Sequence, residues 1–254
     1  MKRYFKGFRM SLGMFCAIPL PRRQWDDSCL DLVLCFFPVV GLLLGLIWLG
    51  IAWLLVLSGI HVMPAAAALA VAPFLLTGFL HLDGYMDTGD ALLSRRPLEE
   101  KLRILKDPHA GAFAVAIAAT LFILQFAAVY AALDAGSGFA SVVFIAVISR
   151  CCASLSILCL KVMPQSGYGN LFRINTGASH KTFVGVLMAV ALGASYIFAG
   201  LTGLAASLSA AAGFTCAMAY AYKEFEGVSG DLTGFALTVG ELCGLLALAA
   251  LGGR

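Results

Sequence analysis

Long uncharged stretches dominate this sequence. No Asp, Glu, Lys or Arg occurs in residues 32–82 or 182–222, two charges interrupt residues 108–160, and one interrupts residues 232–253. A helix needs about 20 apolar residues to cross a bilayer. At that length the stretches divide into seven predicted helices, over residues 31–57, 63–80, 109–133, 139–160, 182–199, 201–222 and 232–252.

One boundary between these predicted helices is marked by few helix-breaking residues. In the middle of residues 182–222, Gly200 and Gly203 mark the division between the fifth and sixth predicted helices. Glycine is a poor residue for a helix interior, so a break is expected there. A six-span alternative keeps the stretch as one long, kinked helix.

Composition agrees with a membrane protein. The 254 residues are 61% hydrophobic and only 12% charged, whereas about 25% of the residues in a soluble domain are charged. Such a chain cannot cover itself with polar side chains, which excludes an ordinary cytosolic globule, a nucleic-acid-binding module and a disordered protein. No linker divides the chain, so residues 1–254 are predicted to form one all-α domain, a polytopic membrane helical bundle.

Basic residues lie on one side of the predicted topology. With seven spans, 15 of the 17 Lys and Arg residues fall in the segments on one side, and the turns on the other side contain none. Those segments are residues 1–30, 81–108, 161–181 and 223–231. By the positive-inside rule they are cytoplasmic and the C-terminus lies outside.

The first 30 residues are both basic and moderately apolar. A signal peptide would have this composition, but Pro19 and Pro21 break the run, no small-residue cleavage site follows, and a true span comes next. We therefore expect residues 1–30 to form an interfacial amphipathic segment that lies on membrane lipid.

Three carboxylates follow the second predicted span. Asp83, Asp87 and Asp90 are spaced by four and then three residues, so on a helix they share one face. We call these three side chains the acid row. Like charges this close repel one another, and oxygen ligands of this kind suit a hard cation, Mg²⁺ or alternatively Mn²⁺.

A solvated helix start is the competing interpretation of the acid row, since Asp is favoured near helix N-termini. Gly84 and Gly89 argue against it. Glycine weakens a helix unless another backbone must approach closely. We therefore expect the acid row to bind metal, within a cytoplasmic active-site loop over residues 81–108 at the mouth of the bundle.

Other polar residues lie near the same side or inside the spans. His81 is a candidate general base, and Asp107-Pro108 and Asp231 predict the starts of the third and last spans. Intramembrane charges are usually functional or paired, whereas single loop cations often serve only topology. The candidates for substrate contact are Lys106, Asp107, Arg150, Arg173, Lys181 and Glu241.

Together these residues indicate metal-assisted phosphate chemistry. Cations held by aspartates would neutralise a diphosphate, basic side chains would grip it, and a hydroxyl would attack. The sequence contains no Walker-type phosphate loop and no nucleophilic serine elbow that would point elsewhere.

The run TGFLHLDGYMDTGDA (77–91) resembles the signature of the cobalamin synthase family, the adenosylcobinamide-GDP ribazoletransferases. Weaker matches follow the family's order: IPLP (18–21), KDPHAGAF (106–113) and SGDLTGFA (229–236), with Glu241 after the last. The acid row also resembles the CDP-alcohol phosphotransferase motif. Two departures are the absence of an arginine before IPLP and Ala91-Leu92-Leu93 in place of a Gly-rich run.

The resemblance implies a Mg²⁺-dependent enzyme of the bacterial inner membrane. It would join adenosylcobinamide-GDP to α-ribazole or its 5′-phosphate and release GMP. By this match the acid row, with Asp231 as a further acid, would hold the metal and diphosphate, and His81 or an aspartate would accept the proton of the attacking ribose hydroxyl.

Two other functions remain open at this stage. An intramembrane prenyltransferase also uses aspartates and Mg²⁺, but usually has two comparable Asp-rich motifs. A transporter would spread its acids through the membrane depth, whereas most acids here lie in the cytoplasmic segments. The sequence leaves open the number of metal ions and whether the chain forms a homo-oligomer.

Overall fold

The computed structural model describes residues 2–19, 25–136 and 139–252. Within these residues the regular structure is helical, which confirms the all-α prediction, and one isolated bridge pairs Val162 with Val228. The elements in chain order are α1 (Lys2–Phe15), the short 3-10 helix η1 (Asp27–Cys29), α2 (Leu30–Leu57), α3 (Val62–Leu76), α4 (Leu80–Leu93), α5 (Leu98–Ile104), α6 (Ala112–Asp134), α7 (Ser141–Cys159), α8 (Gly167–Phe172), α9 (Ala178–Phe225) and α10 (Gly230–Leu251).

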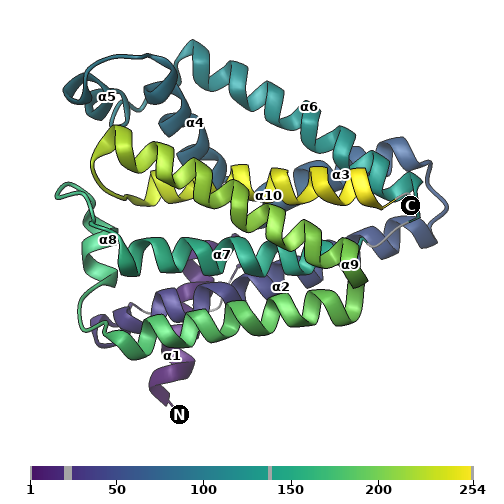
Figure 1. Ribbon diagram of the computed structural model, residues 1–254, viewed down its shortest axis with the longest axis horizontal. Helices are drawn as coiled ribbons and strands as arrows, with labels where there is room; N and C mark the ends of the chain where they lie inside the picture. The colour runs from purple at the N-terminus through teal and green to yellow at the C-terminus, as the bar shows by residue number, and fades with distance from the viewer. Residues whose placement is uncertain (1, 20–24, 137–138, 253–254) are drawn as a thin grey trace.

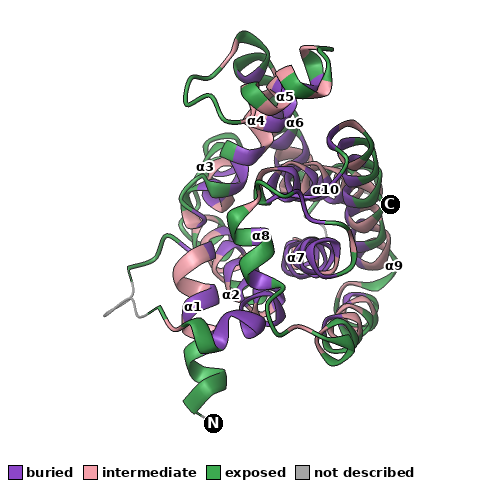
Figure 2. Cartoon of the chain, turned by 90° about the vertical axis from the view of Figure 1, so that its left-hand side faces the viewer, coloured by how far each residue is buried: buried purple, intermediate pink, exposed green. Residues whose placement is uncertain are grey.

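The long helices form a bundle around α7. In Figure 1 α2, α7, α9 and α10 run along the long axis of the molecule, and the end-on view of Figure 2 shows α7 at the centre with the others around it. Of the most apolar 18 residues of α7, 83% are buried, against 17% for α9. Helix α7 is therefore the core of the bundle, whereas α9 exposes apolar side chains along its outer faces, as lipid contact requires.

Five helices are long and apolar enough to cross a membrane, or six if α3 and α4 together make one crossing. The predicted second helix, 63–80, ends earlier than expected, at Leu76, because Gly78 and Phe79 both adopt positive φ angles of 62°. Helix α4 then leaves α3 at 90°. The 15 residues of α3 span only about 22 Å, so the number of seven spans stays a prediction.

The break predicted at Gly200 is confirmed. Helical geometry is continuous over the 48 residues of α9 except at Gly200, whose φ of 63° and ψ of −158° are not helical. In Figure 1 α9 runs the length of the bundle, turns sharply and returns. A straight helix of this length would extend about 72 Å, more than twice the hydrocarbon thickness, so α9 is long enough to cross the membrane twice.

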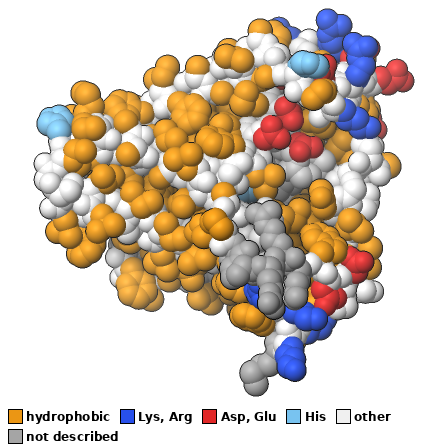
Figure 3. All heavy atoms as spheres, turned by 180° about the vertical axis from the view of Figure 1, so that it is seen from behind, with side chains coloured by type: hydrophobic (Ala, Val, Ile, Leu, Met, Phe, Trp, Pro, Cys, Tyr) orange, Lys and Arg blue, Asp and Glu red, His pale blue; other side chains and the backbone are white. Residues whose placement is uncertain are grey.

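Charge is segregated at one end of the molecule. On the face shown in Figure 3, Lys, Arg, Asp and Glu side chains gather at the end where α5 and α8 lie, whereas the opposite end is mostly hydrophobic. The same charged end holds α1, which buries Met10 and Phe15 against the bundle and exposes Tyr4 and Phe5. This is the amphipathic pattern predicted for the N-terminal segment; its contact with lipid stays a prediction.

Candidate active site

The acid row lies on a single helix at the charged end. Asp83, Asp87 and Asp90 all belong to α4, which confirms the helical spacing on which the prediction of a shared face depended. Asp83 is exposed to solvent, and Asp87 and Asp90 are half-buried. The row therefore runs from the open surface into the contact between α4 and its neighbours.

Both glycines inside the row are sites of close approach, as expected. A Cβ atom at Gly84 would lie 2.8 Å from the carbonyl oxygen of Asp231, and a Cβ at Gly89 would overlap the side chain of Ile117. Gly84 therefore brings the backbone of α10 against α4, whereas Gly89 leaves room for the Ile117 side chain of α6. As a result Asp231, 148 residues after Asp83 in the sequence, lies beside the acid row.

Four negative charges act on one another at this place. The charges of Asp83, Asp90 and Asp231 all act on Asp87. Within residues 2–19, 25–136 and 139–252, none of the four carboxylates forms an ion pair with Lys or Arg, and no three His, Cys, Asp or Glu side chains converge closely enough to hold a metal ion by themselves. The site thus concentrates negative charge that its described neighbours leave uncompensated.

Asp90 has a hydrogen bond that sequence reasoning missed. Its Oδ1 accepts the backbone N–H of Ala114 at 3.2 Å, in the first turn of α6. The helix was expected to start at Asp107-Pro108, but that prediction was wrong: α6 begins at Ala112, with Gly111 as its N-cap. Asp107 instead accepts the backbone N–H of His109 at 2.9 Å, and this contact lowers the pKa of the Asp107 carboxyl.

Asp231 lies inside the last helix rather than before it. It was expected to precede that helix as its cap, but the N-cap of α10 is Ser229, whose side chain accepts the N–H of Leu232 at 3.3 Å. Asp231 lies in the first turn of α10. Its side chain is therefore not used as the cap and remains beside the acid row.

His81 lies away from the carboxylates. It precedes Asp83 by two residues, which puts it on the opposite face of α4. The residue is only 7% exposed, and its ring lies 5.9 Å from that of Phe37 in α2. Its carbonyl oxygen accepts the Thr238 hydroxyl of α10 at 3.3 Å. The imidazole thus faces the bundle interior rather than the acid row.

The two intramembrane charges contact each other. The Arg150 guanidinium in α7 forms an ion pair with Glu241 in α10, and the Ser149 hydroxyl donates to the same carboxylate at 3.1 Å. Arg150 is 2% exposed, and both charges line a small cavity together with Trp48 and Pro73. These two candidates for substrate contact therefore lie inside the bundle as a partnered pair.

The three candidate loop cations are spread over the charged end. Lys106 and Lys181 are exposed. Arg173 donates to the carbonyl oxygen of Leu160 at 3.0 Å, just beyond the last residue of α7. Arg173 thus interacts with the negative end of the α7 dipole. This structural contact does not prevent the guanidinium from also binding an anion.

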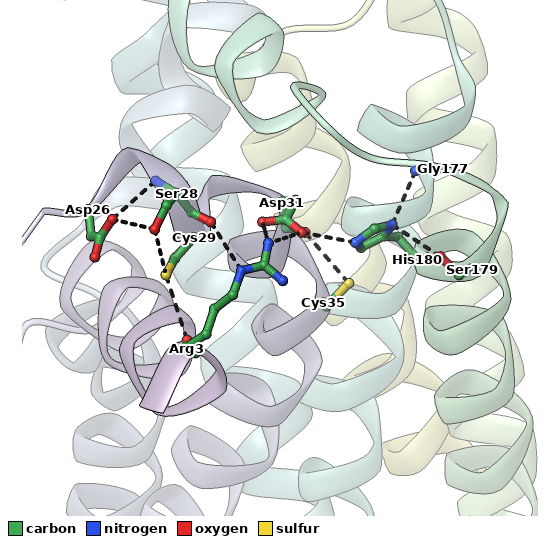
Figure 4. A network of polar contacts seen from close by, with 9 residues as sticks. All are labelled: Arg3, Asp26, Ser28, Cys29, Asp31, Cys35, Gly177, Ser179 and His180. Carbon is green, nitrogen blue, oxygen red and sulfur yellow. Dashed lines mark hydrogen bonds and ion pairs between the residues drawn. The ribbon is translucent and has the colours of Figure 1, made fainter. Parts of the chain in front are cut away.

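A buried carboxylate outside the predicted site joins three helices. Figure 4 shows Arg3 of α1 and His180 of α9 converging on Asp31 of α2. Arg3 Nη2 donates to both oxygens of Asp31 at 2.7 Å, and His180 Nε2 lies 3.2 Å from Oδ2. Because the Gly177 N–H donates to Nδ1 of the same ring, Nε2 carries the proton that Asp31 accepts.

Sequence reasoning missed this contact because its partners are 28 and 149 residues apart. One signal was present: Asp31 is the last charge before a long uncharged span, and a carboxylate entering a membrane helix usually has a partner. The contact fixes α1 and the start of α9 to α2 at the charged end.

Fold and site together define a class: a polytopic helical membrane protein whose aspartates from two helices meet at the charged end of the bundle. The model of the cobalamin-5-phosphate synthase family matches residues 7–249. The chain belongs to this family.

Three relatives illustrate the similarity. The chain is 37% identical to the adenosylcobinamide-GDP ribazoletransferase of Clostridium botulinum (strain Alaska E43 / Type E3), covering 96% of this chain and 97% of that protein. It is 35% identical to the protein of the same name in Clostridium perfringens (strain SM101 / Type A), covering 98% and 99%, and 32% identical to that of Geotalea daltonii, covering 96% and 97%. No solved structure matches the chain.

Proposed function

We propose that the acid row and Asp231 bind the diphosphate of a GDP-activated cobinamide through Mg²⁺, at the cytoplasmic end of the bundle. The observation that carries this proposal is the meeting of four carboxylates from α4 and α10, brought together by Gly84 and left without an ion pair to any described Lys or Arg. Such a cluster of negative charge needs a cation.

The family gives the reaction. As a member of the cobalamin-5-phosphate synthase family, with relatives named adenosylcobinamide-GDP ribazoletransferase, the chain is a transferase of cobalamin synthesis that joins a cobinamide-GDP to a ribazole. We infer that the acceptor is α-ribazole or its 5′-phosphate and that GMP is released. The large apolar helices make the protein a multi-pass membrane protein, and we infer the bacterial inner membrane as its location.

The donor set fits magnesium better than zinc. All four groups are carboxylates, the hard oxygen ligands that Mg²⁺ prefers, and His81 lies on the opposite face of α4. Mg²⁺ is commonly held by one or two carboxylates together with waters and substrate phosphates. A closed cage of three protein side chains is therefore not required, which agrees with the spacing of these aspartates along α4. When bound, the ion would supply charge neutralisation to the diphosphate.

The residues of the chain would act in a simple displacement. A ribazole hydroxyl attacks the phosphorus on the cobinamide side, a P–O bond to that hydroxyl forms, and the bridging P–O bond breaks so that GMP leaves. An aspartate accepts the hydroxyl proton. Asp83 is best placed for this role because it is exposed at the open end of the row, whereas Asp90 is engaged with α6.

Direct turnover tests the function. Purified protein in lipid would be given adenosylcobinamide-GDP, α-ribazole and Mg²⁺, and both GMP and the corrinoid product would be measured. We expect the two products in equal amounts. GMP without a joined corrinoid would indicate a hydrolase, and no GMP at all would overturn the proposal. A parallel reaction with ribazole 5′-phosphate identifies the preferred acceptor.

A further inference from the structure

The first turn of α6 depends on a side chain from another helix. Its N-cap is Gly111, which has no side chain, and no capping hydrogen bond comes from its own segment. The N–H of Ala114 is instead satisfied by Asp90 Oδ1 of α4, 24 residues earlier, at 3.2 Å. Capping usually comes from the N-cap residue itself, so the end of α6 and the last member of the acid row are directly coupled.

Gly111 makes room for this contact. A Cβ atom added there would lie 2.6 Å from Cγ of Asp90 and would overlap both carboxylate oxygens. The backbone at Gly111 is extended, with φ −79° and ψ 171°, a conformation open to any residue. A side chain at this position would therefore displace the Asp90 carboxylate, so glycine supplies space here rather than backbone freedom.

The contact lies at the end of an exposed segment. Lys106, Asp107 and His109 lie in the loop between α5 and α6, and all three are exposed. The loop reaches α6 at Gly111, where the Asp90 carboxylate meets it.

We propose that Gly111 is a positioning residue: by leaving room for the Asp90 carboxylate at the start of α6, it sets the orientation of Asp90 within the acid row. The contribution of this arrangement to turnover rests on the proposed function of the acid row, whereas the positioning of Asp90 does not.

Hydrogen–deuterium exchange of the full-length protein tests the positioning without turnover. In Gly111→Ala, the amides of residues 112–116 should exchange about fivefold faster, the effect expected when one capping contact is lost. Asp90→Ala should have the same effect. The matched control is Gly177→Ala, at the N-cap of α9, where an added Cβ meets nothing within 4 Å; exchange at 112–116 should not change. Unchanged exchange in Gly111→Ala would overturn the inference.

A double variant covers the case in which Gly111→Ala folds poorly. Combining it with Asp90→Ala removes the carboxylate that the new methyl group would meet, so yield and thermal stability should recover to the level of Asp90→Ala alone. A double variant that is worse than both single variants would mean that the methyl group clashes with something other than the Asp90 carboxylate, and would contradict the proposal.

Turnover then separates the inference from the proposed function. We expect Gly111→Ala to raise the Mg²⁺ concentration for half-maximal rate by about 10-fold or more, as loss of a residue that orients a ligand usually does. Faster exchange with unchanged Mg²⁺ dependence, while Asp87→Asn is inactive, would overturn the positioning role and leave the function intact. Faster exchange with an active Asp87→Asn would instead support the positioning of Asp90 and overturn the function of the acid row.

Discussion

Gly84 of α4 lies against the backbone of Asp231 in α10, so closely that a single added carbon would be 2.8 Å from the Asp231 carbonyl oxygen. This approach turns a row of carboxylates on one helix into a site made by two. Gly234 extends the same contact, since a Cβ there would lie 3.3 Å from the carbonyl oxygen of His81. The spacing between α4 and α10 is therefore set by glycine backbones.

Gly84→Ala should separate the two helices. The methyl group would force α4 and α10 apart, destabilise the protein by about 1–3 kcal/mol as overpacking usually does, and lower turnover by more than this loss of folded protein explains. Thermal unfolding in detergent and turnover at saturating Mg²⁺ would be measured together. Gly185→Ala in α9, where an added Cβ has open space, is the control. A fully active Gly84→Ala variant would show that the distance between Asp231 and the acid row is unimportant.

Asp87→Asn should lower turnover by about 100-fold or more, because it removes the charge that the other three carboxylates surround. Membrane insertion and thermal stability should be retained, since relief of repulsion does not destabilise the fold. Asp134→Asn is the matched control, an exposed aspartate at the end of α6. Substantial activity in Asp87→Asn would reduce the acid row to a solvated helix segment.

Arg150→Met should destabilise the bundle strongly, by about 3–5 kcal/mol, because the half-buried Glu241 would lose its only cationic partner among the described residues. Adding Glu241→Gln should recover most of that stability. We would measure a double-mutant cycle from the unfolding temperatures of the wild type, both single variants and the double variant. If the single variants were as stable as the wild type but failed to bind substrate, the pair would be a substrate contact rather than a structural one.

The orientation in the membrane can be tested by cysteine labelling. Cys159 and Cys216 are the exposed cysteines of the described chain, and both would first be changed to serine. Arg96→Cys, between α4 and α5, should be labelled only from the cytoplasm, and Ser58→Cys, between α2 and α3, only from the other side. Labelling of Arg96→Cys by an impermeant reagent applied from outside would overturn the predicted orientation.

Local sequence features predicted the parts of the site that depend on one helix. The spacing of Asp83, Asp87 and Asp90 specifies a shared face from helix geometry alone, and a glycine within such a row indicates that another backbone lies close. Neither feature says which backbone it is. The approach of Asp231 to Gly84 depends on packing between segments that are far apart in the chain, which no local pattern encodes.

The same limit explains the wrong helix start at Asp107. Asp-Pro is a good local signal for an N-terminus, but α6 is capped from another helix by Asp90, so the start moves to Ala112. The early end of α3 is instead a local feature. Gly78 is a recognisable break, and although the positive φ of Phe79 is unusual for a residue with a bulky side chain, the turn is closed by the hydrogen bond from the Phe79 N–H to the Phe74 carbonyl oxygen at 2.8 Å.

The reversal of α9 at Gly200 affects the structure at the opposite, charged end of the molecule. Because α9 folds back, its second half ends at Phe225 at the charged end, next to the loop that precedes α8. There Val228 exchanges two backbone hydrogen bonds with that loop, to Lys161 and Met163, each at 2.9 Å. Asp231 follows three residues later. The turn at Gly200 thus brings the start of α10, and with it Asp231, to the charged end, and a side chain at Gly200 would strain that turn because its φ is 63°.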